Sequence, residues 1–367
     1  MKPMDGDGLL GWLREEDPDK IESLWEWANT VRRRTVGDEV HLRGLIEISS
    51  FCRRRCLYCG LRADNSLIER YRMSRREILE SARHAQRLQF GTVVLQGGED
   101  PGCSADWVAS VIRELKKESS LAVTLSLGER SYGELALWRE AGADRYFLRF
   151  ETSDAALYRR IHPSLPSIPS DRLSILRSLR GLGYEIGSGV MIGIPGQSYR
   201  SLVEDILLFR SLDLDMIGVG PFLPHPATPL GTSPRQFSRT DGEQVPATEL
   251  MVTKVIALSR IFCPEANIPS TTALATLNPE RGYELGLERG ANVVMPNLTP
   301  HPYRSRYEIY PKKAGTGRTS FDAGEIRDRI RSMGRTVGKG PGKRSPGCLR
   351  VPGSKILMGV EQFGEQP

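Results

Sequence analysis

The sequence predicts an α/β protein: a (β/α)8 TIM barrel with an N-terminal helical extension and a basic, flexible C-terminal tail. Eight short apolar or β-branched runs alternate with amphipathic helical stretches, a pattern typical of parallel β–α–β units. Eight such units in about 250 residues match the size of a single barrel. The 367-residue chain therefore divides into an extension (1–40), a barrel (41–310) and a C-terminal region (311–367).

Each predicted element has its own pattern. The extension is expected to be helical, because LWEWANTVRRRT places apolar residues at helical spacing. Stretches such as SRREILESARHAQRLQF and SLVEDILLFRSLDL predict the helices between strands. The eight predicted strands are Leu42–Ile48, Thr92–Gln96, Leu121–Leu127, Arg145–Phe150, Ile186–Ile192, Asp215–Val219, Ile268–Thr272 and Ala291–Met295.

Composition excludes several classes of protein. A hydrophobic content of 39% with 26% charged residues is ordinary for a globular chain. A mean hydropathy of −0.35, with no apolar stretch near the roughly 18 residues that a membrane helix needs, argues against a transmembrane span. The first twenty residues lack an apolar signal core, and six cysteines in a long chain indicate a reducing compartment. We therefore expect a cytoplasmic protein without a membrane partner.

The excess positive charge is local. Ten basic and three acidic residues lie between Lys312 and Arg344, whereas the rest of the chain has 41 basic and 42 acidic residues. The same region is rich in Gly and Pro, which is typical of a solvated, flexible tail. The net charge of +6 therefore comes from this region, and the rest of the chain is close to neutral. For this reason we expect no nucleic-acid partner, and at most a docking arm for an acidic protein.

A cysteine cluster follows the first predicted strand. Cys52, Cys56 and Cys59 have the spacing C-x3-C-x2-C, and three thiolates on one tight loop can bind one metal centre. Structural zinc usually takes four ligands, so three cysteines fit a [4Fe–4S] cluster with one open iron better. A zinc loop completed by a distant His or Cys is the alternative. The remaining cysteines are isolated: Cys103, Cys263 and Cys348.

With Tyr58 beside the last cysteine, the loop resembles the C-x3-C-x-aromatic-C signature of radical S-adenosylmethionine (SAM) enzymes. The resemblance implies one [4Fe–4S] cluster whose open iron chelates the amino and carboxylate groups of SAM. An electron from the cluster then cleaves the sulfonium and gives a 5′-deoxyadenosyl radical, while the barrel positions the cofactor. A reductant such as ferredoxin or flavodoxin is also implied.

The same resemblance implies a SAM site at the strand ends. QGGE after the second strand resembles the motif that binds the SAM ammonium, where glycines allow close backbone approach. Glu151 would contact the ribose or ammonium, Arg172 would hold the carboxylate, and MIGIPGQ would lie against the adenosine. An ordinary turn, surface Glu or helix-surface Arg is the alternative at these positions. The implied SAM residues are Tyr58, Gln96, Gly97, Gly98, Glu99, Ser126, Glu151, Arg172 and Ile194.

Longer segments between about residues 36 and 312 resemble one group within that superfamily. DMIGVGPFLPHPATPL and NVVMPNLTPHPYR are similar to the HydE family of FeFe-hydrogenase maturases, which is close to biotin synthase and the methylornithine synthases. The resemblance implies a small organometallic substrate, a cysteine-bound iron with carbonyl and cyanide ligands. Radical attack at the substrate sulfur would feed assembly of the di-iron part of the hydrogenase H-cluster. Other hydrogenase maturases are implied partners.

An anionic, cyanide-bearing iron should require cations and hydrogen-bond donors inside an otherwise apolar barrel. Arg43 is the leading candidate because an unpaired interior charge is costly. Hydroxyl groups could supply further donors, Ser126 among them, and Met295 a soft packing surface; each hydroxyl could equally be a satisfied interior donor. The substrate candidates are Arg43, Thr124, Thr271, Thr272, Met295, Tyr303 and Tyr307.

Two departures from the family pattern affect these predictions. Some HydE proteins hold a second cluster on extra cysteines, but KKAGTGRTSFDAGEIRDRI has none, so we expect one cluster only. Phe150 stands where the pattern suggests His, which puts one hydrogen bond in doubt. Two other functions stay open: a methylornithine-synthase-like mutase, and a zinc- or cluster-bearing scaffold whose basic tail holds nucleic acid.

Overall fold

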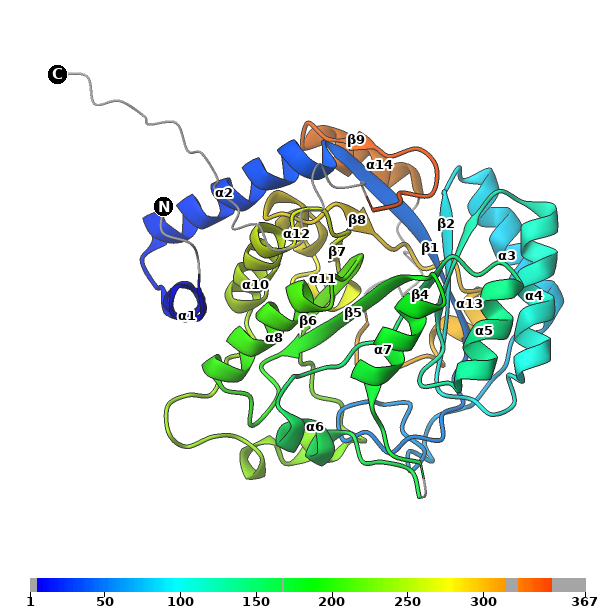
Figure 1. Ribbon diagram of the computed structural model, residues 1–367, viewed down its shortest axis with the longest axis horizontal. Coiled ribbons are helices and arrows are strands. Elements are labelled where there is room, and N and C mark those ends of the chain that lie inside the picture. Colours follow the sequence, from blue (N-terminus) through cyan, green and yellow to red (C-terminus); the bar gives the residue numbers. More distant parts are fainter. Residues whose placement is uncertain (1–4, 167, 314–322, 345–367) are drawn as a thin grey trace.

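A barrel of eight parallel strands forms the centre of the molecule (Figure 1). The computed structural model describes residues 5–166, 168–313 and 323–344. The strands coincide with the eight predicted runs, although several are shorter. They are β1 (Glu39–Ser49), β2 (Thr92–Gly97), β3 (Ala122–Ser126), β4 (Arg145–Phe147), β5 (Glu185–Ile192), β6 (Met216–Pro221), β7 (Pro269–Ser270) and β8 (Val293–Val294).

Parallel pairing runs around the barrel in the order β6-β5-β4-β3-β2-β1-β8-β7. The ring is completed beside β7, where the amide of Ile217 donates to the carbonyl of Asn267 at 3.0 Å. The amide of Asn267 in turn donates to the carbonyl of Asp215 at 2.9 Å. All strands point the same way, so their carboxyl ends and the loops that follow them meet at one rim.

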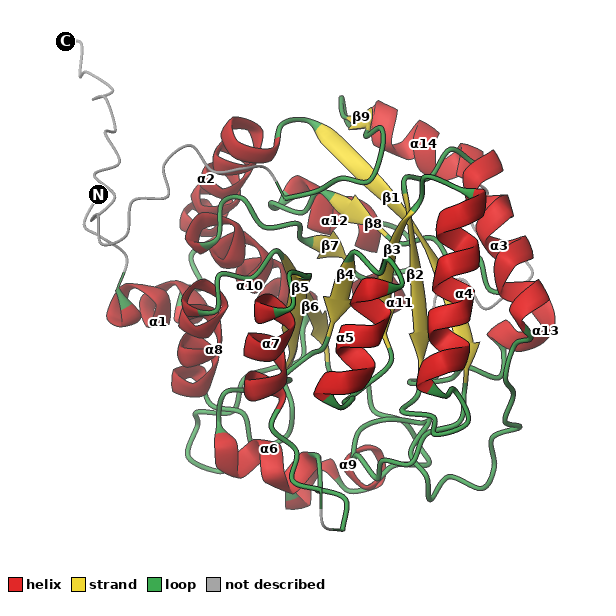
Figure 2. Cartoon of the chain, turned by 45° about the vertical axis from the view of Figure 1, so that its right-hand side comes forward, coloured by secondary structure: helices red, strands yellow, loops and turns green. Residues whose placement is uncertain are grey.

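Helices surround the strands as an outer layer (Figure 2). Local sequence sets where several begin: Ser74 and Glu77, and likewise Ser131 and Glu134, form capping boxes. The helices after β1 are α3 (Arg75–Arg87), α4 (Ala105–Glu118), α5 (Tyr132–Glu140), α6 (Ala155–Ile161), α7 (Arg172–Gly181), α8 (Tyr199–Ser211), α9 (Pro229–Thr232), α10 (Glu249–Phe262), α11 (Thr272–Leu277), α12 (Gly282–Glu288) and α13 (His301–Arg304), with a 3-10 turn at Pro234–Gln236.

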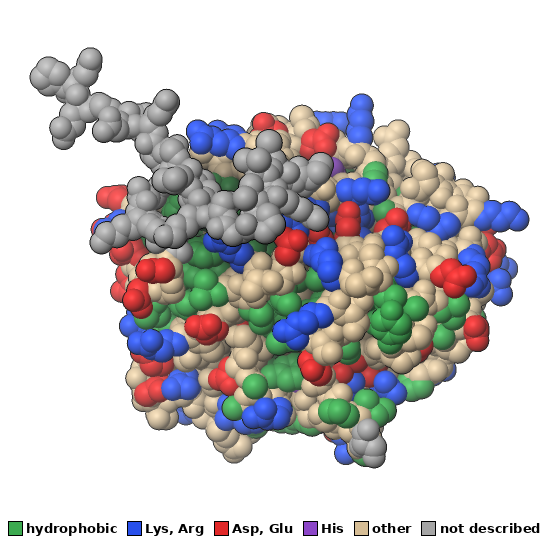
Figure 3. Space-filling view, viewed as in Figure 1, with side chains coloured by type: hydrophobic (Ala, Val, Ile, Leu, Met, Phe, Trp, Pro, Cys, Tyr) green, Lys and Arg blue, Asp and Glu red, His purple; other side chains and the backbone are tan. Residues whose placement is uncertain are grey.

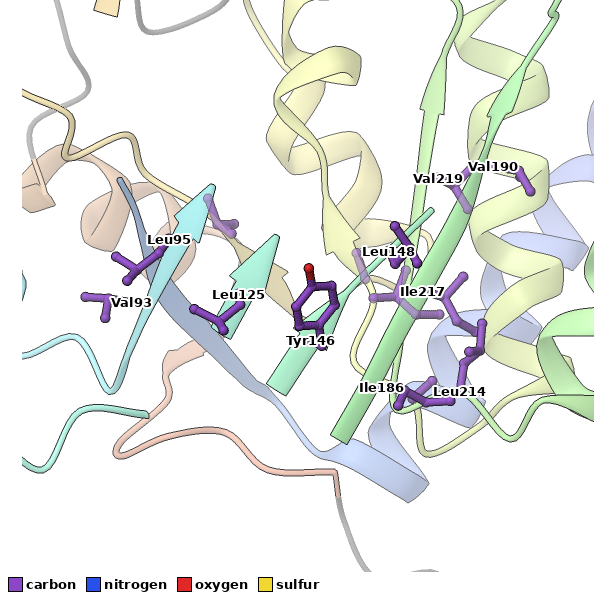
Figure 4. Packing of buried hydrophobic residues seen from close by; sticks show 14 of the residues in the cluster. Val93, Leu95, Leu125, Tyr146, Leu148, Ile186, Val190, Leu214, Ile217 and Val219 are labelled. Atoms are coloured by element: carbon purple, nitrogen blue, oxygen red, sulfur yellow. The ribbon is translucent and has the colours of Figure 1, made fainter. Parts of the chain in front are cut away.

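The main hydrophobic core lies between strands and helices, because alternate strand residues face outward. In and after β4, the buried Tyr146 and Leu148 belong to this core (Figure 4). Arg145 and Phe147 face inward instead: Arg145 donates to the Thr92 hydroxyl at 3.0 Å, and the Phe147 ring fills the space beside two strand glycines. Each strand thus supplies one face to the core and one to the barrel interior.

The N-terminal extension consists of α1 (Gly6–Arg14) and α2 (Pro18–Val36). Asp17 caps α2 by accepting from the amides of Asp19 and Lys20. The buried Leu9, Leu13 and Leu24 belong to the same core as the barrel helices. The extension therefore packs on the outside of the barrel and does not form a separate core.

The structure differs from the predicted flexible tail over residues 323–344. This segment forms α14 (Ala323–Ser332) and β9 (Thr336–Val337), and β9 pairs with the start of β1. Buried Arg335 donates to the carbonyls of Leu287 and Asp38, so one of the basic residues stabilises packed structure. The predicted tail at 314–322 and beyond residue 344 lies outside the described residues.

The molecular surface carries interspersed charges of both signs on the face shown in Figure 3. None of the helices in the described parts of the chain is long and apolar enough to cross a membrane.

Candidate metal centre and active site

The three clustered cysteines lie on the loop between β1 and α3, at the carboxyl-end rim of the barrel (lower part of Figure 1). Arg70 holds this loop, because its guanidinium donates to four backbone carbonyls at 2.5–3.1 Å. The amide of Gly60 also donates to the carbonyl of Ile309 at 2.9 Å. These contacts give the loop a defined shape.

The chemistry of this loop fits a cluster. Burial, followed by the charge of Cys52, raises the pKa of the Cys59 thiol to about 12; burial and Cys59 raise the pKa of Cys56 well above its usual range. Three buried, mutually repelling thiolates need compensating positive charge, which iron supplies.

The end of β2 packs directly against the cysteine loop. A Cβ atom on Gly98 would lie 2.2 Å from the carbonyl oxygen of Phe51 and 2.8 Å from the Cβ of Cys52, so only glycine fits. The amide of Glu99 faces the Cys52 sulfur at 3.4 Å. The Glu99 carboxylate accepts from Arg53 and Arg54 at 2.9 Å, and it therefore anchors the loop.

Glu129, just after β3, is the centre of a buried charge network. Its carboxylate accepts from Arg54 at 2.8 Å, Arg172 at 2.9 Å and Ser170 at 2.6 Å, and His162 Nε2 lies 3.1 Å away. Burial opposes ionisation, but the His162 hydrogen bond and the charge of Arg172 hold the pKa of Glu129 well below its usual range. This network holds Arg172 at the rim, where SAM binding was predicted for it.

His162 connects that network to the metal centre. Its Nδ1 lies 3.0 Å from the Cys56 sulfur, and the ring is fully enclosed. Burial, and then the charge of Arg172, lower the pKa of His162 to about 4. Such an imidazole, oriented by a carboxylate beside a metal ligand, fixes the direction of that ligand.

Glu151 occupies a strained position at the same rim. Its φ of 65° is unusual for a residue with a side chain, and Arg149 Nε lies 3.1 Å from its Oε2. That pair lacks hydrogen-bond geometry, so Oε2 of Glu151 and Nε and Nη2 of Arg149 are buried without a hydrogen-bond partner among the described residues. Buried polar atoms in this state are ready to bind a polar ligand, which fits the amino and carboxylate groups of SAM.

A second, smaller apolar cluster lies beside the cysteine loop. Ile194 is fully buried there, and Leu57 and Tyr58 pack against the cluster. Its buried members are Leu157, Ile161, Met191, Ile194, Phe222 and Leu230. Ile194, which was predicted to lie against the adenosine, is therefore part of an apolar cluster beside the cysteine loop.

The predicted substrate residues are only partly brought together. Thr124 on β3 faces the interior, and its hydroxyl has no hydrogen-bond partner within the described residues. Gln96 donates to the hydroxyl of buried Tyr307 at 3.3 Å, and in the register of β2 and β3 Gln96 pairs with Ser126. Gln96 and Ser126 lie at the carboxyl ends of β2 and β3, and Tyr307 contacts Gln96, so these three side chains are nearer the cysteine loop. Thr124 lies two residues before Ser126 and pairs in register with Arg145, the first residue of β4.

Other candidate hydroxyls are already engaged. Thr271 caps α11 and donates to the carbonyl of Val219 at 3.1 Å, and Thr272 hydrogen-bonds to Tyr283. Tyr303 lies outside the barrel interior, where it donates to Glu77 of α3 at 2.7 Å. Met295 follows β8 and is half-buried.

The structure places Arg43 at the opposite end of the barrel from the cysteine loop. Arg43 pairs in register with Thr92, the first residue of β2, and its guanidinium contacts the Met216 sulfur and the carbonyl of Gly342. The position of Arg43, far from the cysteine loop, therefore does not support its prediction as the leading substrate cation. Its Nε is buried without a hydrogen-bond partner among the described residues, as are Nη1 of Arg54 and Nε and Nη2 of Arg149 at the rim.

Phe150 faces outward. Its ring packs against Phe209 of α8, with the ring centroids 5.7 Å apart, and the side chain is buried in the outer core. A His at this position would point away from the barrel interior. Phe150 therefore gives no reason to expect that a hydrogen bond is missing inside the barrel.

Sequence reasoning missed four site residues. Glu129 could have been found, because it follows the third predicted strand directly and so reaches the same rim as Glu99 and Glu151. Arg149 also precedes a strand-end carboxylate. Nothing in the sequence distinguishes Arg54 from its two neighbouring arginines, and His162 follows a short helix without any motif.

The comparisons with known proteins agree with this site. Residues 46–209 match the model of the Radical SAM superfamily, which defines the class of enzyme. The chain is 48% identical over 295 residues to the [FeFe] hydrogenase maturase subunit HydE of Thermotoga maritima, covering 80% of each chain. It therefore belongs to the HydE family of radical SAM enzymes.

More distant relatives share the same architecture. The chain is 30% identical over 290 residues to the 3-methylornithine synthase of Methanosarcina acetivorans, covering 78% of each chain. The crystal structure of methylornithine synthase (PylB) superimposes with a TM-score of 0.78 at 25% identity, covering 92% of this chain and 94% of that one. As a radical SAM enzyme of this family, the chain uses a [4Fe–4S] cluster and SAM, which it cleaves reductively.

Proposed function

We propose that this chain matures FeFe-hydrogenase by directing the 5′-deoxyadenosyl radical at a cysteine-bound iron that carries carbonyl and cyanide ligands. The observation that supports this most is the pair Glu151 and Arg149, whose buried polar atoms have no hydrogen-bond partner among the described residues beside the three-cysteine loop. When bound, the cluster and SAM supply one-electron cleavage of the sulfonium and hence the radical.

In this proposal the rim residues bind and orient the cofactors. Cys52, Cys56 and Cys59 hold the cluster, with His162 orienting Cys56. Backbone groups of Gly97 and Gly98 and the Glu151 carboxylate bind the SAM ammonium and ribose. Gln96, Glu99, Ser126 and Arg172 support that site, and Tyr58 and Ile194 enclose the adenine.

The substrate would lie inside the barrel next to SAM, at the end nearer the cysteine loop. Arg149 Nε and Nη2 are buried donors without a hydrogen-bond partner among the described residues, and the guanidinium lies beside the Glu151 carboxylate. A cyanide nitrogen is a hydrogen-bond acceptor that a guanidinium can satisfy. The Thr124 hydroxyl and the Tyr307 ring complete this region. Arg149 thus takes the role that the sequence suggested for Arg43.

The electron donor, the recipient of the product, the location in the cell and the division of the chain belong to the same proposal. The donor would be a one-electron carrier such as ferredoxin or flavodoxin, and the product would pass to other hydrogenase maturases. We also propose a cytoplasmic location, which the cysteine usage supports. We further propose that residues 1–40 serve as an extension and 41–310 as the catalytic barrel.

The test is anaerobic incubation of reconstituted protein with SAM, a reductant and the cysteine-bound iron carbonyl cyanide complex. We expect the complex to be consumed together with SAM, and the iron product to have a changed infrared spectrum in the carbonyl and cyanide region. Formation of 3-methylornithine by this protein, with the iron complex untouched, would support the mutase alternative that the similarity to methylornithine synthases suggests.

A further inference from the structure

His162 contacts the middle cysteine of the loop from a different part of the chain. It follows the last residue of α6, and its Nδ1 lies 3.0 Å from the Cys56 sulfur. The side chain of Tyr58 also hydrogen-bonds to this sulfur. The Cys52 sulfur, in contrast, faces the backbone amide of Glu99 at 3.4 Å. Cys56 therefore has a nitrogen neighbour on a side chain, which a substitution can remove.

The imidazole of His162 is held in place on several sides. The ring of Tyr158 stacks against it, with the ring centroids 5.1 Å apart, and the His162 amide donates to the carbonyl of Tyr158 at 2.8 Å. On the far edge of the ring, Nε2 lies 3.1 Å from the Glu129 carboxylate and 3.1 Å from Nη2 of Arg172. These contacts keep Nδ1 directed at the Cys56 sulfur.

The hydrogen between Nδ1 and the sulfur must belong to the ring once the sulfur binds iron. A thiolate ligand has no hydrogen to donate, so it only accepts. Nε2 of His162 has both a donor, Arg172, and an acceptor, Glu129, within 3.1 Å, and the ring can therefore carry a hydrogen on Nδ1. An N–H group that donates to a negatively charged sulfur makes a charge-assisted hydrogen bond, which is stronger than a neutral one.

We propose that the Nδ1–H group of His162 donates to the Cys56 sulfur and thereby raises the reduction potential of the cluster. Hydrogen bonds to the ligand sulfurs are among the factors that set this potential. On reduction, an external one-electron donor loses one electron and the cluster gains it, and no proton is transferred. The buried site then holds one more negative charge. A donor aimed at the sulfur stabilises the reduced state more than the oxidised state, and burial strengthens this effect.

His162 is thus a positioning residue that acts through Cys56. The inference rests on the proposed cluster ligands but not on the identity of the substrate. It also gives the buried network around Glu129 a second consequence, because the groups that hold Arg172 at the rim also hold the imidazole against the metal ligand.

The test uses the two different nitrogens of the histidine ring. The amide nitrogen of Asn can occupy the position of Nδ1, whereas that of Gln reaches the position of Nε2. His162→Gln should therefore lose the donor to Cys56 and keep a donor to Glu129, and His162→Asn should keep the donor to Cys56. The measurement is a redox titration of the reconstituted full-length protein, followed by electron paramagnetic resonance of the reduced cluster.

At a fixed solution potential, we expect the ratio of reduced to oxidised cluster in His162→Gln to fall about tenfold, which is a shift of about 59 mV for one electron. His162→Asn should stay close to the wild-type value. A merely structural role of His162 predicts instead that both variants shift alike, and that result would overturn the proposal. Equal potentials in His162→Gln and the wild type would overturn it as well.

A matched control is His225→Asn. His225 is buried beside the same loop, since a Cβ atom on Gly60 would lie 2.7 Å from its Nε2. Its Nδ1 accepts from the amide of Ala227 at 3.0 Å, and the side-chain oxygen of Asn can keep that contact. The potential of this variant should equal that of the wild type. A fall as large as that in His162→Gln would show that any buried histidine at this rim has the same effect, which contradicts the proposal.

A second measurement on the wild-type sequence remains decisive even where a variant loses iron. In protein made with isotopically labelled histidine nitrogen, electron–nuclear double resonance of the reduced cluster should detect a coupled histidine nitrogen. Its absence would overturn the proposal. Failure of the wild type to assemble any iron–sulfur cluster would overturn the proposed function, and this inference with it.

Discussion

At the scale of single residues, the site is defined by which buried charges are satisfied and which are not. Glu99 and Glu129 are fully engaged by arginines and His162, whereas Glu151 and Arg149 retain unsatisfied atoms among the described residues. Satisfied groups give the rim its shape, and unsatisfied groups are left for ligands. A sequence shows which residues are charged but not how they pair, so this distinction could not be predicted.

The Glu151→Gln variant should bind SAM about 10- to 100-fold more weakly, because a hydrogen bond to a charged group is worth about 1.5–3 kcal/mol. Equilibrium dialysis of the reconstituted protein measures this, and the iron content should stay at the wild-type value. The control is Glu134→Gln in the capping box of α5, which should bind SAM normally. Unaltered SAM affinity in Glu151→Gln would remove Glu151 from the site.

Asp205 predicts a pH dependence of stability. It accepts from the amide of Ser153 at 2.5 Å, and burial raises its pKa to about 7. Between the ordinary carboxyl pKa of about 4 and 7, the folded state holds a proton that the unfolded state has lost, so stability falls as pH rises through this window.

The Asp205→Asn variant should lack this loss of stability with rising pH. Relative to the variant, the wild type should lose a few degrees of Tm between pH 5 and pH 8, as measured by thermal unfolding at several pH values. Parallel curves for the two proteins would show that Asp205 does not titrate as described.

At the scale of elements, the strands were predictable and their lengths were not. Short apolar or β-branched runs between helical stretches located all eight. However, β7 and β8 have only two residues each, because strand length depends on hydrogen bonds with neighbours. The contact between β2 and the cysteine loop was not predicted. The glycines of QGGE were expected to allow close backbone approach to SAM, and the structure shows Gly98 against the Phe51 carbonyl and Cys52.

Replacing Gly98 with Ala should separate the end of β2 from the cysteine loop, since the new Cβ would collide with the Phe51 carbonyl. We expect clearly less than the roughly four irons per chain of one complete cluster, measured after anaerobic reconstitution. Gly133→Ala in α5 is the matched control: nothing lies within 4 Å of its Cβ, and alanine favours the helix by about 0.5–1 kcal/mol. A full iron content in Gly98→Ala would contradict the proposed packing requirement.

At the scale of the whole molecule, the C-terminal segment closes the end of the barrel opposite the cluster. The carbonyl of Pro341 accepts from Arg145 at 3.0 Å, and that of Gly342 accepts from Arg43 at 3.1 Å and Asn267 at 3.2 Å. The Gly- and Pro-rich composition suggested a flexible tail, because these residues break regular structure. Composition could not reveal that their backbone carbonyls satisfy buried arginines.

Ending the chain after Gly334 should therefore destabilise the protein, since each buried donor left without an acceptor costs about 1–3 kcal/mol. Ending it after Arg344 keeps every contact described for this segment and should leave the wild-type stability. Denaturant unfolding of the two truncated proteins measures the difference. Equal stabilities would show that residues 335–344 do not support the barrel.

The central claim is that the three-cysteine loop holds a cluster that cleaves SAM. Its most direct test is 5′-deoxyadenosine formation by anaerobically reconstituted protein with dithionite and methyl viologen, compared with the Cys59→Ala variant. We predict a brown wild-type protein with about four irons per chain that forms 5′-deoxyadenosine, and a variant that lacks both the cluster and the product. A colourless wild-type protein that binds zinc, or SAM cleavage retained in Cys59→Ala, would contradict the claim.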